Sequence, residues 1–139
     1  MIYLASPFFN KKERSAVTLI ADFLRNKGID VYVPMEHEVP NAWDLSNEVW
    51  AKKVFNEDIK AIDECDTVVV LNWGMYSDSG TAWECGYAYA KKKKVINLLM
   101  PTNDKDYSLM MINGSTEVMP WFSFVKEEEW KNLKAINQK

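Results

Sequence analysis

The chain has 139 residues, the length of one domain, so we expect a single folding unit over residues 1–139. A hydrophobic fraction of 47% and a charged fraction of 27% exclude a disordered or collagen-like chain. The net charge of −3 argues against binding to nucleic acid, which a basic surface would favour.

Membrane, secreted and metal-binding proteins are also disfavoured. The longest apolar runs are far shorter than the ~20 residues that cross a bilayer, so no membrane association is expected. No basic region precedes the first apolar run, which argues against a signal peptide and predicts a cytoplasmic protein. Two cysteines and one histidine are too few for a disulfide framework or a zinc site, and no metal is expected.

Strand and helix patterns alternate in the first half of the chain. Residues 2–5 are an apolar run closed by a Ser-Pro pair, which predicts a buried strand entering a loop. Asn10 begins a helix with a capping-box pattern, and Gly28 ends it. A second strand is predicted over residues 30–34, followed by a polar loop and a helical period over residues 44–65.

The alternation continues in the second half. Residues 67–71 form an uninterrupted apolar run rich in β-branched side chains, typical of a central strand covered on both faces. A helix is predicted over residues 81–93 and a further buried strand over residues 95–99. A helical turn at 109–113 and an amphipathic helix over 125–136 follow. This order predicts an open parallel sheet with helices on both faces, where ligands bind beyond the carboxyl ends of the strands.

The glycines do not indicate a nucleotide cofactor. None of them stands in a dinucleotide fingerprint or a Walker pattern, so no cofactor is predicted. A Ser-His-Asp triad would depend on His37 alone, a loop residue, and is disfavoured. Gly86 and Ala90 form a small-residue edge that predicts close packing of their helix on the sheet.

Carboxylates in apolar surroundings are the most informative residues. Glu84 is the only acidic residue of its helix, and is either a structural partner of a buried donor or a desolvated nucleophile for glycosyl transfer. Asp58 lies beside the apolar stripe of its helix, either ion-paired at its edge or part of a site. Asp78 suits a helix N-cap or a ligand contact. Tyr3 is expected to be a core residue whose hydroxyl has a hydrogen-bond partner. Phe8 lies either at the rim of the core or in the wall of a site for a flat ring.

Three segments resemble the nucleoside 2-deoxyribosyltransferase family, namely IYLASPFFN, NEDIKAIDECDTVVV and DSGTAWECGYAYA. The resemblance spans residue 1 to about residue 112 in order and spacing. It implies a flavodoxin-like open parallel five-stranded sheet flanked by helices on both faces, no cofactor, and exchange of the base on 2′-deoxyribonucleosides. It also implies homo-oligomers (a dimer or a trimer of dimers) whose active sites are completed by a neighbouring subunit.

By position, the resemblance assigns roles to four of these residues. Glu84 matches the family's nucleophile, and Tyr3 matches the tyrosine that orients it. Asp58 and Asp78 match the two aspartates that handle the leaving base and the sugar hydroxyls. We expect Asp58 to be the acid because its apolar neighbours would raise its pKa, and Asp78 to hold a sugar hydroxyl. We expect Phe8 to contact the substrate.

The chain departs from the family pattern at two expected substrate contacts. Glu38 stands where many members carry a glutamine that reads the base, and an ionised carboxylate cannot donate a hydrogen bond. Ser108 stands where the family has an asparagine that reaches a neighbour's 5′-hydroxyl. A serine there also resembles the deoxynucleoside 5′-monophosphate N-hydrolases, but the glycine-rich phosphate loop of those enzymes is missing here.

The sequence therefore predicts a pentosyltransferase that acts on deoxyribonucleosides and free nucleobases. The alternative is an N-glycoside hydrolase that uses the same carboxylates with water as acceptor. A non-catalytic nucleoside-binding module on the same fold is a third possibility, and the fold alone does not separate the three.

Overall fold

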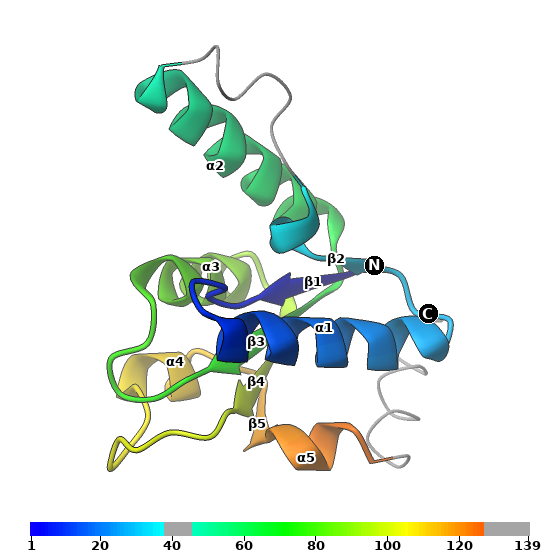
Figure 1. Ribbon diagram of the computed structural model, residues 1–139, viewed down its shortest axis with the longest axis vertical. Coiled ribbons are helices and arrows are strands. Elements are labelled where there is room, and N and C mark those ends of the chain that lie inside the picture. The colour runs from blue at the N-terminus through cyan, green and yellow to red at the C-terminus, as the bar shows by residue number, and fades with distance from the viewer. Residues whose placement is uncertain (38–45, 127–139) are drawn as a thin grey trace.

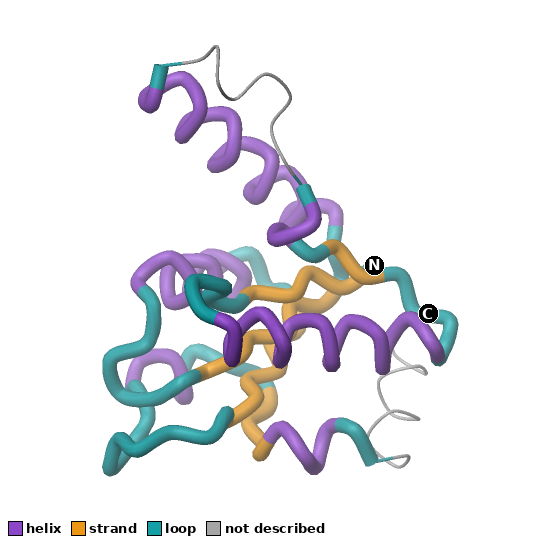
Figure 2. Tube along the Cα trace, in the orientation of Figure 1, coloured by secondary structure: helices purple, strands orange, loops and turns teal. Residues whose placement is uncertain are grey.

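The computed structural model describes residues 1–37 and 46–126, and shows a parallel β-sheet between two layers of helices (Figures 1 and 2). The strands are β1 (Ile2–Ala5), β2 (Val31–Tyr32), β3 (Thr67–Asn72), β4 (Lys94–Leu99) and β5 (Glu117–Pro120). They pair in the order β2-β1-β3-β4-β5, and every pair is parallel. This arrangement confirms the five-stranded open sheet that the sequence predicted.

Helices cover both faces of this sheet. They are α1 (Lys11–Asn26), the 3₁₀ turn η1 (Pro34–Glu36), α2 (Asn47–Glu64), α3 (Ser79–Ala90), α4 (Leu109–Asn113) and α5 (Trp121–Phe124). α1 and α5 pack on one face, while α3, α4 and the end of α2 pack on the other (Figure 1). Among the described residues, no helix is long and apolar enough to cross a membrane.

Successive side chains of each strand point to opposite faces of the sheet, and this divides the core into two layers. Ile2 and Leu4 of β1 point into the layer under α1, whereas Tyr3 and Ala5 point toward α3. All six residues of β3 are buried, as expected for a strand covered on both faces. Because Tyr3 lies on the α3 side, the sheet carries its hydroxyl to the residues of that helix.

The boundaries of α1 follow the predicted capping chemistry. The Asn10 side chain accepts a hydrogen bond from the backbone N–H of Glu13 at 2.8 Å. The Glu13 carboxylate in turn accepts from the backbone N–H of Phe9 at 2.9 Å. After the helix, Gly28 adopts a φ of +80°, a conformation that glycine accepts without strain.

Several predicted boundaries were wrong. The second strand covers only Val31–Tyr32, because Pro34 lacks a backbone N–H and begins the 3₁₀ turn. The helix predicted over 81–93 ends at Ala90, and the chain then turns through Lys92 at a φ of +61°. The fifth strand was not located, because it is a mostly exposed edge without an apolar period. Most of the helix predicted over 125–136 lies outside the described residues.

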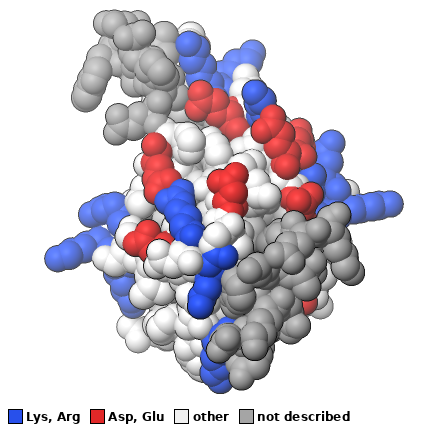
Figure 3. Space-filling view, turned by 90° about the vertical axis from the view of Figure 1, so that its right-hand side faces the viewer, with Lys and Arg blue, Asp and Glu red and all other residues white. Residues whose placement is uncertain are grey.

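One prediction about helix packing was also wrong. α3 contacts the sheet with Cys85 and Ala88, whereas Gly86 and Ala90 are exposed on its other side. α2 buries only Ala61 and Ile62, and the rest of the helix extends away from the sheet (Figure 1). Acidic and basic side chains are interspersed on the face shown in Figure 3.

Candidate active site

Glu84 lies in the second turn of α3 with its carboxylate directed at β1. The hydroxyl of Tyr3 donates a hydrogen bond to Oε2 of Glu84. Tyr3 has no exposed surface, and its ring stacks on Tyr32 with centroids 5.6 Å apart. Strand β1 and helix α3 therefore hold this carboxylate in one orientation.

The buried position changes the acidity of both groups. Burial raises the pKa of Glu84 to about 7, the Tyr3 hydrogen bond opposes this, and the charges of Asp58 and Asp78 add to it. Burial and the neighbouring Glu84 charge raise the pKa of Tyr3 well above its usual range. Tyr3 therefore remains a protonated donor at every physiological pH.

Asp58 reaches the same place from α2. It shares with Glu84 a cavity of about 350 Å³ between α2 and α3. The walls are large apolar side chains from these two helices: Trp50, Val54, Phe55, Ile59, Ile62 and Trp83. Burial raises the pKa of Asp58 to about 6, Glu57 adds to the rise, and His37 opposes it.

Two carboxyl groups with raised pKa values in one apolar cavity form an acid–base pair. Between pH 6 and 7 such a pair holds about one proton, so one group can donate it while the other acts as a nucleophile. Retaining glycosidases divide the work between two carboxyl groups in this way. A larger open groove, of about 850 Å³ between α1 and α5, contains neither carboxylate and is not the candidate site.

Among the described residues, three further predicted site residues do not line this cavity: Asp78, Phe8 and Ser108. Asp78 caps α3, and its Oδ2 accepts from the N–H and the hydroxyl of Thr81, both at 2.9 Å. Its charge still acts on Glu84. Phe8 lies outside the cavity lining, 39% exposed and stacked on Phe9 at 6.2 Å.

Ser108 lies on the other side of α3. It caps α4 and lines a second cavity, of about 430 Å³, together with Cys85 and Gly86. It therefore does not contact the Glu84 cavity of its own chain. Glu38 lies outside the described residues.

Sequence reasoning missed the contribution of α2 to the cavity wall. Trp50, Phe55 and Asp58 share one face of this helix at helical spacing, and that spacing could have predicted a common cavity. The pattern was instead interpreted as a packed face, yet Phe55 is 52% exposed. In residues 1–37 and 46–126, no cluster of His, Cys, Asp or Glu suits a metal ion.

Comparison with known proteins identifies the family of this chain. The family model of nucleoside 2-deoxyribosyltransferases matches residues 2–119. The chain belongs to the nucleoside 2-deoxyribosyltransferase family. A 2-deoxyribosyltransferase from the psychrotolerant bacterium Bacillus psychrosaccharolyticus is 30% identical, with a TM-score of 0.74, covering 96% of this chain and 89% of that one. No curated protein sequence matches.

Two more distant structures share the fold. A conserved protein from Enterococcus faecalis V583 is 21% identical with a TM-score of 0.70, covering 95% of this chain and 97% of that one. A Clostridium botulinum CMP N-glycosidase, BcmB, is 22% identical with a TM-score of 0.56, covering 96% of this chain and 97% of that one. Membership of the family indicates an enzyme that acts on nucleosides.

Proposed function

We propose that this protein is a nucleoside 2-deoxyribosyltransferase that exchanges the base of a 2′-deoxyribonucleoside through a covalent ester on Glu84. The observation that carries this proposal is the hydrogen bond from buried Tyr3 to Glu84, in a cavity that Glu84 shares with Asp58. The family match and the 30% identical 2-deoxyribosyltransferase support it.

In the first half of the reaction, Glu84 attacks C1′ of the sugar. The C1′–N bond breaks, its electron pair stays on the departing base, and Asp58 supplies the proton that this base takes up. The Tyr3 hydrogen bond occupies Oε2, so Oε1 is the oxygen that forms the ester.

In the second half, a ring nitrogen of an incoming base attacks C1′ from the opposite side. The ester bond breaks, Glu84 is released as a carboxylate, and Asp58 takes the proton that the incoming base loses. Two inversions give net retention at C1′. The apolar walls formed by Trp50, Phe55 and Trp83 suit a flat base and limit competition from water.

The free protein must redistribute one proton before it reacts. The pKa of about 7 for Glu84 and about 6 for Asp58 favour the proton on Glu84, whereas the chemistry needs it on Asp58. Positive charge that develops at C1′ favours the ionised form of Glu84, and the basic nitrogen of the substrate favours the acid form of Asp58. Substrate binding therefore drives the exchange.

Other parts of the site complete the substrate contacts. We assign a sugar hydroxyl to Asp78, whose carboxylate acts electrostatically on Glu84. The aromatic ring of Phe8 and the side chain of Glu38 are assigned to the substrate on the family pattern. The substrates are deoxyribonucleosides and free nucleobases.

We assign Ser108 to the active site of a neighbouring subunit in a homo-oligomer. In support, Ser108 lies by an apolar groove between α3 and α4, away from its own Glu84 cavity. Leu109 and Met110 are strongly exposed beside this groove, and nothing lies within 4 Å of a Cβ placed on Gly86. A second copy of the chain would cover these apolar residues.

Sedimentation tests this assembly. The wild type should be an oligomer, and Gly86→Glu should dissociate it without loss of the fold, because the new side chain has space in the single subunit. Gly86→Ala is the matched control and should remain assembled. A monomeric wild type would contradict the shared site.

Chromatography with deoxyinosine, with and without adenine, tests the reaction. Deoxyadenosine should form only when adenine is present, and Glu84→Gln should abolish it. Glu48→Gln, at an exposed glutamate on α2, is the matched control and should retain activity. Hypoxanthine and deoxyribose released without adenine would instead identify the N-glycoside hydrolase. An absence of turnover would contradict both the transferase and the hydrolase function.

A further inference from the structure

Gly80 lies in the first turn of α3, four residues before Glu84. Both residues line the cavity between α2 and α3, together with Trp83. Residues four apart lie on the same face of a helix, so Gly80 and Glu84 are neighbours on the face that borders the cavity. Because glycine has no side chain, this face has a gap one turn before the carboxylate, and the gap is exposed to solvent.

The side chain of Glu84 leans toward this gap. In an α-helix the Cα–Cβ bonds tilt toward the N-terminus, so a side chain covers the turn that precedes its own Cα atom. The turn that precedes Glu84 is the one that contains Gly80. A ligand atom that occupies the gap would therefore lie beside the carboxylate that the proposed reaction uses as nucleophile.

Asp78 borders the same gap. A Cβ atom placed on Gly80 would lie 3.2 Å from Oδ2 of Asp78 and 4.0 Å from its Cγ. Among the described residues, the two hydrogen bonds to this carboxylate come from the N–H and the hydroxyl of Thr81, and both end on Oδ2. Oδ1 can therefore accept a hydrogen bond from a ligand. The gap thus lies between a carboxylate that can attack a carbon atom and one that can hold a hydroxyl group.

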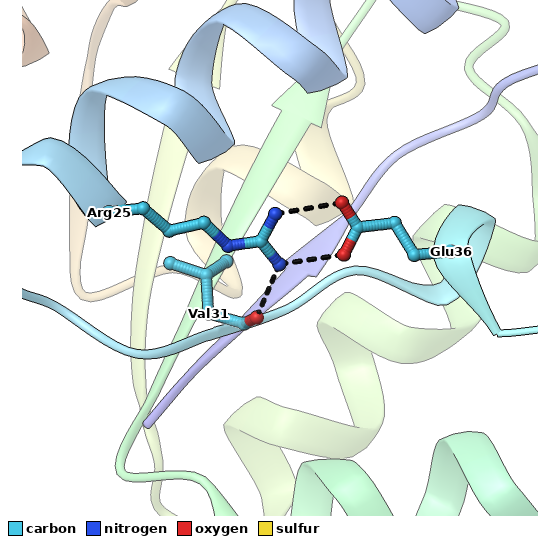
Figure 4. A network of polar contacts seen from close by, with 3 residues as sticks. All are labelled: Arg25, Val31 and Glu36. Atoms are coloured by element: carbon cyan, nitrogen blue, oxygen red, sulfur yellow. Dashed lines mark hydrogen bonds and ion pairs between the residues drawn. The ribbon is translucent and has the colours of Figure 1, made fainter.

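The charges around the gap favour an uncharged ligand. Of the described residues that line the cavity, none is a lysine or an arginine. Arg25 belongs to α1 on the opposite face of the sheet, and it forms two 2.7 Å hydrogen bonds to Glu36 and one of 2.9 Å to the carbonyl oxygen of Val31 (Figure 4). Carboxylates repel an anion but accept hydrogen bonds from hydroxyl groups, so the gap suits a sugar ring better than a phosphate group.

We propose that Gly80 is a specificity-determining residue, whose missing side chain provides the space for the sugar ring between Glu84 and Asp78. The inference rests on the transferase proposed above and divides its site into two parts. The aromatic walls of Trp50 and Trp83 hold the flat base, and the gap at Gly80 holds the sugar. A methyl group at residue 80 therefore competes with the sugar of a nucleoside but not with a free base.

Calorimetric titration tests this division. It uses Glu84→Gln protein, in which no ester forms, so that deoxyinosine binds without reacting. Gly80→Ala in this protein should raise the Kd of deoxyinosine by about 10- to 200-fold, the usual effect of one methyl group in a filled pocket, and that of adenine by less than about threefold. Gly86→Ala is the matched control on the same helix, because it lies outside this cavity and its Cβ has open space, and it should change neither Kd. An unchanged Kd for deoxyinosine in Gly80→Ala, or equal losses for both ligands, would overturn the role.

A second background separates the sugar space from the position of Asp78. The Cβ atom added by Gly80→Ala lies close enough to the Asp78 carboxylate to displace it slightly. Asp78→Ser removes this carboxylate but keeps a side chain that caps a helix. In the Asp78→Ser background, Gly80→Ala should still weaken the binding of deoxyinosine. A loss that disappears in this background would show that the methyl group acts only by moving Asp78, and would overturn the proposal.

The same titrations distinguish this role from the transferase reaction. A selective loss of deoxyinosine binding in Gly80→Ala, with no base exchange by the wild type, would overturn the transferase and support the sugar space. Base exchange by the wild type, with no selective loss in Gly80→Ala, would overturn the sugar space alone. An absence of deoxyinosine binding in every variant would overturn both.

Discussion

Replacing Glu84 by glutamine should make the free protein more stable above neutral pH. The carboxyl group has an ordinary pKa of 4.5, which burial raises to about 7 in the folded chain. The folded protein therefore binds this proton more tightly than the unfolded chain does. The stability of the wild type should fall as pH rises from about 4.5 to about 7 and then level off.

The size of the effect follows from that difference. One pKa unit corresponds to about 1.4 kcal/mol, so the ionised form of Glu84 costs the folded state about 3 kcal/mol at pH 8. Glutamine has the same shape, cannot ionise, and can still accept the Tyr3 hydrogen bond through its amide oxygen. Glu84→Gln should therefore gain about 3 kcal/mol at pH 8 and less than about 1 kcal/mol at pH 5.

Urea unfolding followed by far-UV circular dichroism at pH 5 and pH 8 measures this difference. With a typical slope, the midpoint of Glu84→Gln should lie about 1–2 M above that of the wild type at pH 8. Glu48→Gln provides the control, because its side chain is exposed, and should change little at either pH. A gain of equal size at both pH values, or a loss of stability at pH 8, would refute an ionisable and desolvated Glu84.

Three further predictions concern the acid–base pair. A plot of the base-exchange rate against pH should be bell-shaped, with limbs at pH values of about 6 and about 7, because the reaction needs one proton on the pair. A sigmoidal plot would contradict a shared proton. Tyr3→Phe should slow base exchange by about 10- to 100-fold, because it removes the free energy of one hydrogen bond to a charged group. A rate equal to that of the wild type would exclude an orienting role for Tyr3. Asp58→Asn should slow base exchange with deoxyinosine by about 10²–10⁴-fold. It should change the rate with 7-methyl-2′-deoxyguanosine little, because the cationic base of that nucleoside leaves without a proton. An equal loss of rate with both nucleosides would show that Asp58 is not the acid.

The sequence predicts the fold well where burial leaves a direct pattern. Residues 67–71 are apolar without interruption because both faces of β3 are covered, and they form the central strand. Glu84 could be singled out because a lone acidic residue in an apolar helix must meet a buried environment. The apolar pattern alone could not name its partner, because Tyr3 is 81 residues away on β1. Only the family resemblance suggested Tyr3.

The predictions failed where an apolar pattern has two possible uses. The apolar stripe of α2 was interpreted as a packed face, yet much of it lines the cavity around Asp58. Periodicity indicates which residues share a face, but not whether protein or ligand covers it. The exposed side of α3 at Gly86 and Ala90 was misassigned for the same reason. The edge strand β5 was missed because an exposed edge gives no apolar pattern.

The arrangement of α2 leads to a last prediction. This helix supplies Asp58 and most of the cavity wall, but it is buried only at Ala61 and Ile62. The rings of Phe55 and Trp83 pack edge-to-face with their centroids 5.3 Å apart. Tyr87 donates a 2.7 Å hydrogen bond to Asp63 of α2. These contacts join α2 to α3.

A base that enters the cavity would contact α2 and α3 at once, and would thereby stabilise the weakly packed part of α2. Amide hydrogen exchange in residues 47–58 should therefore slow when adenine is added, whereas β3, buried throughout, should not change. Uniform slowing in both elements would indicate global stabilisation by ligand. Unchanged exchange in residues 47–58 at saturating adenine would show that the base binds elsewhere, and that Asp58 is not beside it.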